Sequence, residues 1–187
     1  LKVLEIQIPY ESDIIVESKS MKLYLNEFYK KSFKIEKELI IKIKKDIESV
    51  IKNPINVKLI NSFCNEPAFK LLNNTKQKFT TPNTLYKFNG FRSICPVTSQ
   101  PDFANIYIFS DKTIEVDWLN KYLISFKEHG GFHEKCIDEI YLKLEKKVNS
   151  NHLEICGRFQ RRGGIDINPV RGNKKLNLFK NFREFNQ

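Results

Sequence analysis

Long apolar runs are missing from this sequence of 187 residues. No stretch approaches the ~18–20 consecutive apolar residues that a membrane-spanning helix requires, which argues against a membrane protein. Neither a signal peptide nor an amphipathic leader rich in Arg and Ser opens the chain, so a cytoplasmic protein is expected. The first residue is Leu1 and it lies within a strand-like run, so we expect the natural protein to begin further upstream.

Cysteine pairs and glycine fingerprints are also missing. The four cysteines are Cys64, Cys95, Cys136 and Cys156, and no two of them form a CxxC pair. Without a secretory signal, such irregular spacings do not predict a disulfide framework, and at least one thiol should be free and reactive. No GxGxxG sequence follows a predicted strand, so a Rossmann site is not supported. His133 has no neighbour at a spacing that would support a zinc site.

Positive charge is abundant: 32 Lys and Arg residues stand against 22 Asp and Glu, a net charge of +10. This balance favours anionic partners such as nucleic acid, a phosphorylated cofactor or an acidic surface. Lys far outnumbers Arg, and Asn, Ile and Phe are common, as in the products of AT-rich genomes. Composition therefore accounts for most of the excess. The hydrophobic fraction of 41% indicates a globular protein of one domain or two small ones.

The apolar pattern predicts an α+β fold. Strands are expected at residues 1–10, 55–63, 153–159 and 165–170, with a hairpin over 103–116 that turns near 110–112. Helices are expected at residues 17–28, 35–51, 119–126 and 132–148. The polar stretch 65–89 is interpreted as a connection between two halves, and the basic tail from Asn173 as loose.

A weak internal repeat underlies this pattern. Glu17, Tyr24, Leu25 and Phe28 recur at one fixed offset as Glu115, Tyr122, Leu123 and Phe126. Each half then has the order strand, helix, helix, strand, which predicts a duplicated unit. The polar residues of the halves differ, as expected if both halves build one shared site.

Cys95 is the candidate nucleophile. Two prolines stiffen the stretch from Cys95 to Asp102, so this loop can hold a thiol and a carboxyl close together. A cysteine attacks as its thiolate, and the charge of Arg92 could lower the thiol pKa while Asp102 transfers protons. From spacing alone, a small buried cysteine beside a turn aspartate is the commoner arrangement.

Two helix starts carry further candidates. Glu134 could be a first-turn charge, or it could bind the amidine edge of a guanine-like base. Ser18 could cap the helix that starts near Glu17, with Glu17 as a surface charge, or Ser18 and Lys19 could bind a phosphate. For each of these helix starts, the residues alone support the structural and the functional interpretation equally.

The turn Arg161-Arg162-Gly163-Gly164 needs a flexible backbone. Its arginines could hold the 2′-phosphate of NADPH, or the segment could be only a basic hairpin turn.

Four motifs, taken in order, resemble those of the QueF family, the NADPH-dependent 7-cyano-7-deazaguanine reductases. They are Glu17-Ser-Lys-Ser-Met-Lys-Leu-Tyr24, Cys95-Pro-Val-Thr-Ser-Gln-Pro-Asp102, Phe132-His-Glu-Lys-Cys136 and Arg161-Arg-Gly-Gly-Ile-Asp-Ile-Asn-Pro169. The order resembles the two-module form of the family, and the resemblance runs from about residue 1 to residue 171.

The resemblance implies a tunnelling fold, with antiparallel sheets backed by paired helices in two tandem modules. The first module, with its linker, would cover residues 1–90, and the second, which carries the nucleophilic cysteine, residues 91–187. Three departures stand out: the first module lacks its leading strand, the linker 65–89 is short, and Gly130-Gly131 replaces a more polar pair.

The resemblance also implies residue roles. Cys95 would add to the nitrile as a covalent thioimide and Asp102 would donate protons. The deazaguanine would be held by Val16, Glu17, Ser18, His133 and Glu134. NADPH would be held by Ser18, Lys19, Arg162 and Gly163. No metal is implied.

Two hydrides from two NADPH would give the aminomethyl product, a precursor of the tRNA nucleoside queuosine. A homodimer or larger homo-oligomer with sites near module interfaces is expected, without direct binding of nucleic acid.

Two alternatives remain open. The same fold could carry a zinc-dependent pterin enzyme similar to GTP cyclohydrolase. A basic RNA-binding module would instead show affinity that depends steeply on salt. Because most aromatic residues fall at core-like spacings, a base-stacking surface is disfavoured.

Overall fold

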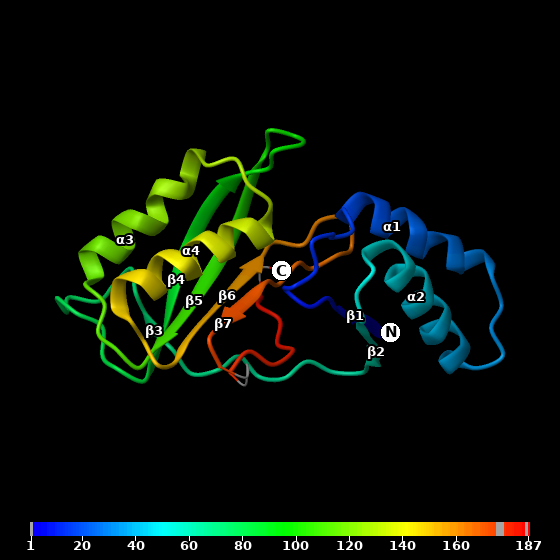
Figure 1. Cartoon of the computed structure of the whole chain (residues 1–187), viewed down its shortest axis with the longest axis horizontal. Coiled ribbons are helices and arrows are strands. Elements are labelled where there is room, and N and C mark those ends of the chain that lie inside the picture. The colour runs from blue at the N-terminus through cyan, green and yellow to red at the C-terminus, as the bar shows by residue number, and fades with distance from the viewer. Residues whose placement is uncertain (1, 175–177, 186) are drawn as a thin grey trace. The chain divides into compact units, whose positions relative to one another are not determined.

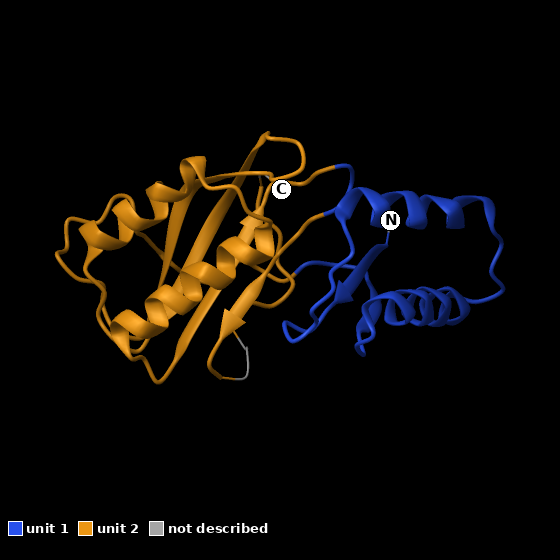
Figure 2. Cartoon of the chain, turned by 45° about the horizontal axis from the view of Figure 1, so that its top comes forward, with its two compact units in different colours: residues 1–63, 163–165 blue, residues 64–162, 166–187 orange. Residues whose placement is uncertain are grey.

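The computed structural model describes residues 2–174, 178–185 and 187, and it divides the chain into two compact units. The first unit contains Leu1–Phe63 and Gly163–Ile165, and the second contains Cys64–Arg162 and Asp166–Gln187 (Figure 2). The predicted module boundary at residues 90/91 falls inside a strand of the second unit.

The first unit is a two-stranded antiparallel sheet with two helices. Its elements are β1 (Val3–Gln7), α1 (Ser18–Glu27), a 3-10 turn (Phe28–Lys30), α2 (Glu36–Ile51) and β2 (Asn56–Ile60). Lys52 is the C-cap of α2, and its left-handed φ of 56° ends the helix before Pro54. The apolar core of the unit is formed by Met21, Ile43, Ile47, Ile51, Ile55 and Val57.

The second unit is a five-stranded sheet in the order β3-β4-β5-β6-β7. The strands are β3 (Lys70–Leu71), β4 (Thr84–Ile94), β5 (Pro101–Ser110), β6 (Leu153–Phe159) and β7 (Val170–Gly172). β3 is parallel to β4, and every other neighbouring pair is antiparallel. Helices α3 (Val116–Ile124) and α4 (His133–Val148) lie side by side across one face of this sheet (Figure 1).

The main core of the second unit lies between the sheet and these two helices. Alternate strand residues such as Ile106, Ile108 and Ile155 face the helices, which contribute Leu123 and Ile140. This is the expected α+β architecture of antiparallel sheet backed by paired helices, and that prediction is confirmed.

The predicted repeat is present in the structure. β1-α1-α2-β2 of the first unit has the same order as β5-α3-α4-β6 of the second, and in each case the two strands pair antiparallel. Each first helix is followed by a 3-10 turn. Glu17 and Glu115 are the N-cap residues of α1 and α3.

The predicted hairpin over 103–116 is wrong, as is the interpretation of 65–89 as a mere connection. β5 pairs with β4, which begins at Thr84, whereas residues 113–115 lead into α3. The residue pair Asn89-Gly90 is typical of a turn, and Gly90 does adopt the positive φ that such a turn needs, +76°. The structure uses it for a β-bulge, where the register shifts between Phe88 and Phe91.

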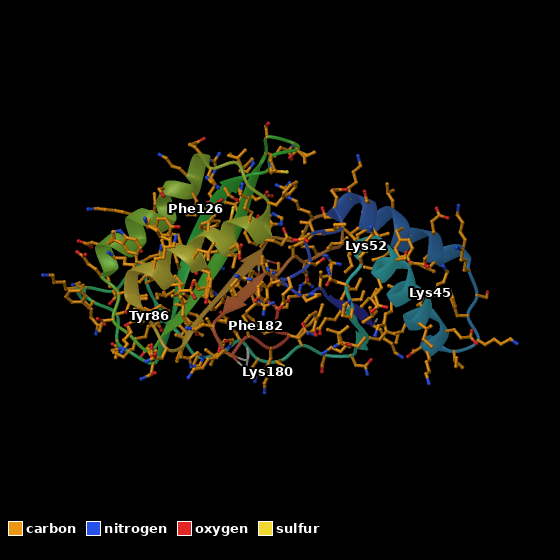
Figure 3. The ribbon with its side chains drawn as sticks, viewed as in Figure 1. Lys45, Lys52, Tyr86, Phe126, Lys180 and Phe182 are labelled. Atoms are coloured by element: carbon orange, nitrogen blue, oxygen red, sulfur yellow. The ribbon has the colours of Figure 1, made fainter. Side chains whose placement is uncertain are left out.

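The predicted strand at 165–170 is also wrong, and so is the prediction of a loose tail where the structure describes it; residues 175–177 and 186 of that tail lie outside the described residues. The last strand is β7, which begins only at Val170. Past it, Phe182 is 1% exposed and Glu184 is 6% exposed, so this part of the chain is packed (Figure 3). On the sheet face away from α3 and α4, Tyr107 is buried by contact with the tail. Sequence periodicity does not predict contacts between segments so far apart in the chain.

No helix in the described part of the chain is both long and apolar enough to cross a bilayer.

Candidate functional site

Cys95 lies in a tight loop between two paired strands. β4 ends at Ile94, which lies opposite Pro101 at the start of β5. Within the loop the Cys95 N–H donates to the Gln100 carbonyl at 2.8 Å, and the Ser99 N–H donates to the Cys95 carbonyl at 2.9 Å. These bonds and the strand pairing fix the position of the thiol at one end of the sheet.

Hydrogen bonds within the same loop activate this thiol. Partial burial alone raises the pKa of Cys95. Hydrogen bonds from the Thr98 hydroxyl and from the N–H groups of Thr98 and Val97 outweigh burial and lower the pKa below that of an ordinary cysteine. The negative charge of Asp102 opposes this shift. The other cysteines of the sheet and of α4 behave differently, because burial raises the pKa of Cys136 and of Cys156 to about 11.

Arg92 does not supply the charge that the sequence suggested. Its guanidinium contacts the Glu128 carboxylate at 3.0 Å and donates to the Lys127 carbonyl. The groups that lower the Cys95 pKa lie in the loop instead: they are the side chain and N–H of Thr98 and the N–H of Val97.

Replacement of Thr98 by Val should therefore raise the pKa of Cys95. The variant loses the hydroxyl donor but keeps a side chain of similar shape, so the thiolate is less stabilised. The pH midpoint of Cys95 alkylation by iodoacetamide, followed by peptide mass spectrometry, should therefore rise above the wild-type value. Thr113→Val, a replacement of an exposed threonine away from the loop, is the matched control. An unchanged midpoint in Thr98→Val would contradict the assigned cause.

A cluster of polar side chains surrounds Asp102, whose carboxyl is only 4% exposed. One oxygen lies 2.7 Å from a terminal nitrogen of Arg162, and the other lies 3.2 Å from Nε2 of His133. The same Arg162 group donates to the Pro101 carbonyl at 2.6 Å. The His133 ring packs against Phe159, with ring centroids 4.1 Å apart. An acid, an imidazole and a guanidinium thus converge beside the cysteine loop.

Glu134 occupies the first turn of α4, next to His133. Its side chain is half-buried, and within the described ranges no hydrogen bond or ion pair engages it. A carboxylate at a helix N-terminus is favoured by the positive end of the helix dipole. Its oxygens are therefore available to N–H donors of a ligand.

In the first unit, Glu17 rather than Ser18 caps α1. The carboxylate accepts the N–H groups of Lys19 and Ser20, each at 2.8 Å, and the Ser20 hydroxyl at 2.9 Å. These hydrogen bonds lower the pKa of Glu17, so it remains charged at neutral pH. Because Glu17 already uses these helix N–H groups, a phosphate here would have to contact the side chains of Ser18 and Lys19.

Two further candidates of the first unit have clear structural reasons. Val16 is half-buried and packs against the apolar core of the unit. Gly163 has a φ of +58°, and a Cβ there would lie 3.0 Å from Cδ of Lys22. Glycine is thus favoured by the left-handed backbone conformation, whereas the flexible end of the Lys22 side chain can move aside.

The structure separates the predicted site residues into two groups. Cys95, Asp102, His133, Glu134 and Arg162 belong to the second unit. Val16, Glu17, Ser18, Lys19 and Gly163 belong to the first.

Sequence reasoning missed two contributors, Thr98 and Phe159. Thr98 follows Cys95 by three residues, a spacing that allows a hydroxyl to reach back in a short turn, and this signal could have been used. Phe159, the last residue of β6, was noted only as a strand end.

Across the described residues no group of three or more His, Cys, Asp or Glu side chains is arranged to hold a metal ion.

Fold and site together define a class of protein: an α+β enzyme with an activated thiol and a buried acid at the end of an antiparallel sheet. Comparison with known proteins narrows the class. Residues 1–59 match the family model described as nitrile reductase, 7-cyano-7-deazaguanine-reductase N-term. Residues 101–177 match the model described as QueF-like protein.

Curated relatives agree. The NADPH-dependent 7-cyano-7-deazaguanine reductase of Buchnera aphidicola subsp. Schizaphis graminum is 33% identical over 205 residues, which cover 96% of this chain and 77% of that protein. The enzyme of the same name from Hahella chejuensis is also 33% identical, covering 87% of this chain and 68% of that protein. The chain belongs to the family of NADPH-dependent 7-cyano-7-deazaguanine reductases, which are oxidoreductases.

A solved structure, the archaeosine synthase QueF-Like in its apo form, aligns with 55% of this chain and 100% of its own, at 14% identity and a TM-score of 0.45.

Proposed function

We propose that this chain reduces the nitrile of 7-cyano-7-deazaguanine to the aminomethyl group, with NADPH as reductant and Cys95 as a covalent nucleophile. The observation that carries the proposal is the lowered pKa of the Cys95 thiol in a loop that ends at the buried Asp102. A nitrile carbon is electrophilic, and a thiolate attacks it far more readily than a thiol.

The first step forms a bond between the Cys95 sulfur and the nitrile carbon. The nitrile nitrogen gains electron density and takes a proton, which gives a neutral thioimide. Asp102 is the proton carrier, since its carboxyl lies between His133 and Arg162 and close enough to influence the charge of Cys95. His133 orients that carboxyl and can restore its proton.

NADPH, when bound, supplies the two hydrides that the carbon must receive. After the first reduction the carbon–sulfur bond breaks, Cys95 leaves as its thiolate and the imine is reduced in place. Asp102 and His133 supply the protons that the nitrogen takes at each stage. Covalent attachment keeps the intermediate in the site, where it cannot escape or react with water.

The deazaguanine base is held by carboxylates. Glu134 and Glu17 both offer carboxylate oxygens, and the amidine edge of the base presents adjacent N–H donors that a carboxylate can bind in pairs. His133 and Ser18 add polar contacts, and Val16 adds an apolar one.

The chain's own residues fit NADPH. The Arg162 guanidinium is partly exposed, with 39% of its side chain accessible, and a planar fork suits a phosphate. Gly163 lets the backbone turn beside it, and half-buried Ser18 and exposed Lys19 offer donors at the start of α1.

The product would serve queuosine synthesis for tRNA, in the cytoplasm. A homodimer or larger homo-oligomer with sites near module interfaces accounts for the distribution of the site residues over two units. No direct contact with nucleic acid is needed, because the substrate is a free base.

Incubation with the cyano substrate and NADPH tests this function. We expect two NADPH to be oxidised for each nitrile consumed, with the aminomethyl base as the product by mass spectrometry. Without NADPH, intact-protein mass spectrometry should show one added substrate mass. Absence of both the adduct and the product would refute the proposal.

A further inference from the structure

The end of the described chain forms a segment with no assigned role. This tail segment, defined as residues 178–185 and Gln187, lies beyond the family-model match, which ends at residue 177. It covers the sheet face opposite α3 and α4, where Phe182 packs on Tyr107 with ring centroids 5.4 Å apart. The guanidinium carbon of Arg158 lies 3.8 Å from the centre of the Phe182 ring.

A buried carboxylate anchors the tail segment to the sheet. Glu184, with 3% of its side chain exposed, accepts from Lys87 at 2.6 Å, from Asn105 at 2.8 Å and from the Tyr107 hydroxyl. Burial lowers the pKa of Lys87, but its hydrogen bonds to Glu184 and Glu66 outweigh burial and raise that pKa, so Lys87 stays protonated in this ion pair. A buried carboxylate with three partners is costly to displace, and the tail segment is thus held in one place.

From this fixed position the tail segment reaches the arginine loop, defined as residues 161–169. Nε of Arg183 lies 3.3 Å from an oxygen of Asp166. The side-chain amides of Gln187 and Asn168 lie 2.8 Å apart, and the Gln187 amide also donates to the Phe159 carbonyl at 2.9 Å. The Arg183 side chain donates from Nη2 to the Gln187 carbonyl at 2.6 Å, and this hydrogen bond links the two contacts.

The arginine loop needs such support because of its glycines. Gly163 and Gly164 have φ values of +58° and +91°, and they separate Arg162 from Asp166. Glycine pairs leave a loop with many accessible conformations, so an arginine on one side of the pair is poorly oriented unless the other side is fixed. Asp166 is the charged residue on that other side, with an ion pair to the anchored tail segment.

We propose that Arg183 is a positioning residue: it holds Asp166, and thereby orients the arginine loop so that Arg162 presents its guanidinium to NADPH. This inference rests on the proposed function, in which Arg162 binds NADPH. It gives the tail segment a part in cofactor affinity, whereas Cys95 and its attack on the nitrile do not depend on it.

The test compares two steps of the same enzyme in the full chain. In Arg183→Gln, KM for NADPH should rise about tenfold while kcat changes less than about threefold. The rate of thioimide formation, measured with the cyano substrate and no NADPH, should equal that of the wild type. A residue with a merely structural role would lower both steps together.

Arg171→Gln is the matched control. Arg171 forms an ion pair of the same kind in the same unit, with 2.7 Å between its Nε and Asp138, and the substitution removes the same charge. Its KM for NADPH should stay at the wild-type value. Asp166→Asn, which preserves side-chain shape, should reproduce the effect of Arg183→Gln, and the double variant should be no worse than either single one.

The outcomes separate the two proposals. A wild-type enzyme that forms no adduct overturns the proposed function itself. A wild-type enzyme that works, with an unchanged KM for NADPH in both Arg183→Gln and Asp166→Asn, overturns the positioning role alone. So does an equal rise in Arg171→Gln, or a loss of adduct formation that parallels the loss of NADPH affinity.

Discussion

Replacement of Cys95 by Ala should abolish both the covalent adduct and the oxidation of NADPH. The sulfur is the only protein atom in the proposed mechanism that bonds to the nitrile carbon, and alanine offers no nucleophile. Loss of a covalent nucleophile typically lowers kcat by more than about 10³-fold. Because Cys95 is only partly exposed and lies in a loop closed by backbone bonds, the variant should fold normally. Intact-protein mass spectrometry and NADPH absorbance report the two losses directly.

Two companion variants show which property of Cys95 matters. Cys95→Ser keeps an oxygen nucleophile of similar size, but the loop donors that stabilise a thiolate cannot ionise a hydroxyl, so this variant should be inactive as well. Cys64→Ser removes an exposed, free thiol away from the cysteine loop and should retain full activity. Turnover by Cys95→Ala within tenfold of the wild type would rule out covalent catalysis at this residue.

The features that sequence predicted well are those carried by local periodicity. Helix α2 repeats apolar residues on one face, and Ile43, Ile47 and Ile51 of that face are buried as expected. The repeat could be detected in the sequence because Glu17 and Glu115 hold the same N-cap position in two helices of similar length. The motif from Cys95 to Asp102 forms a short loop that brings the two ends of neighbouring strands together, and the catalytic roles of these two residues stay predictions.

The features that sequence missed depend on contacts between distant residues. β4 was hidden because Gly90 looks the same in a bulge as in a turn, and only pairing with β5 distinguishes them. The tail was predicted as loose because its basic composition does not show that Phe182 and Glu184 fit a polar sheet face. The effect of Thr98 on Cys95 likewise depends on the backbone conformation of the loop.

Replacement of Asp102 by Asn should separate proton transfer from thiol activation. Asparagine keeps the shape of the buried side chain but cannot donate an acidic proton, so thioimide formation and kcat at saturating NADPH should both fall by about 10²–10⁴-fold. Cys95 itself should become at least as reactive, because the Asp102 charge raises the pKa of the thiol and asparagine removes that charge.

Alkylation of Cys95 by iodoacetamide needs no proton donor and therefore measures thiol activation alone. In Asp102→Asn we expect alkylation at least as fast as in the wild type, with its pH midpoint at or below the wild-type value. Arg162→Gln is the control for the lost ion pair, since it also breaks the 2.7 Å contact but leaves the acid in place. That variant should raise KM for NADPH and leave thioimide formation near the wild-type rate. If Asp102→Asn slowed alkylation and thioimide formation equally, the carboxyl would be supporting the loop rather than moving a proton. The acid role would then pass to His133. Among the described residues, His133 is the one titratable group besides Arg162 that directly contacts Asp102.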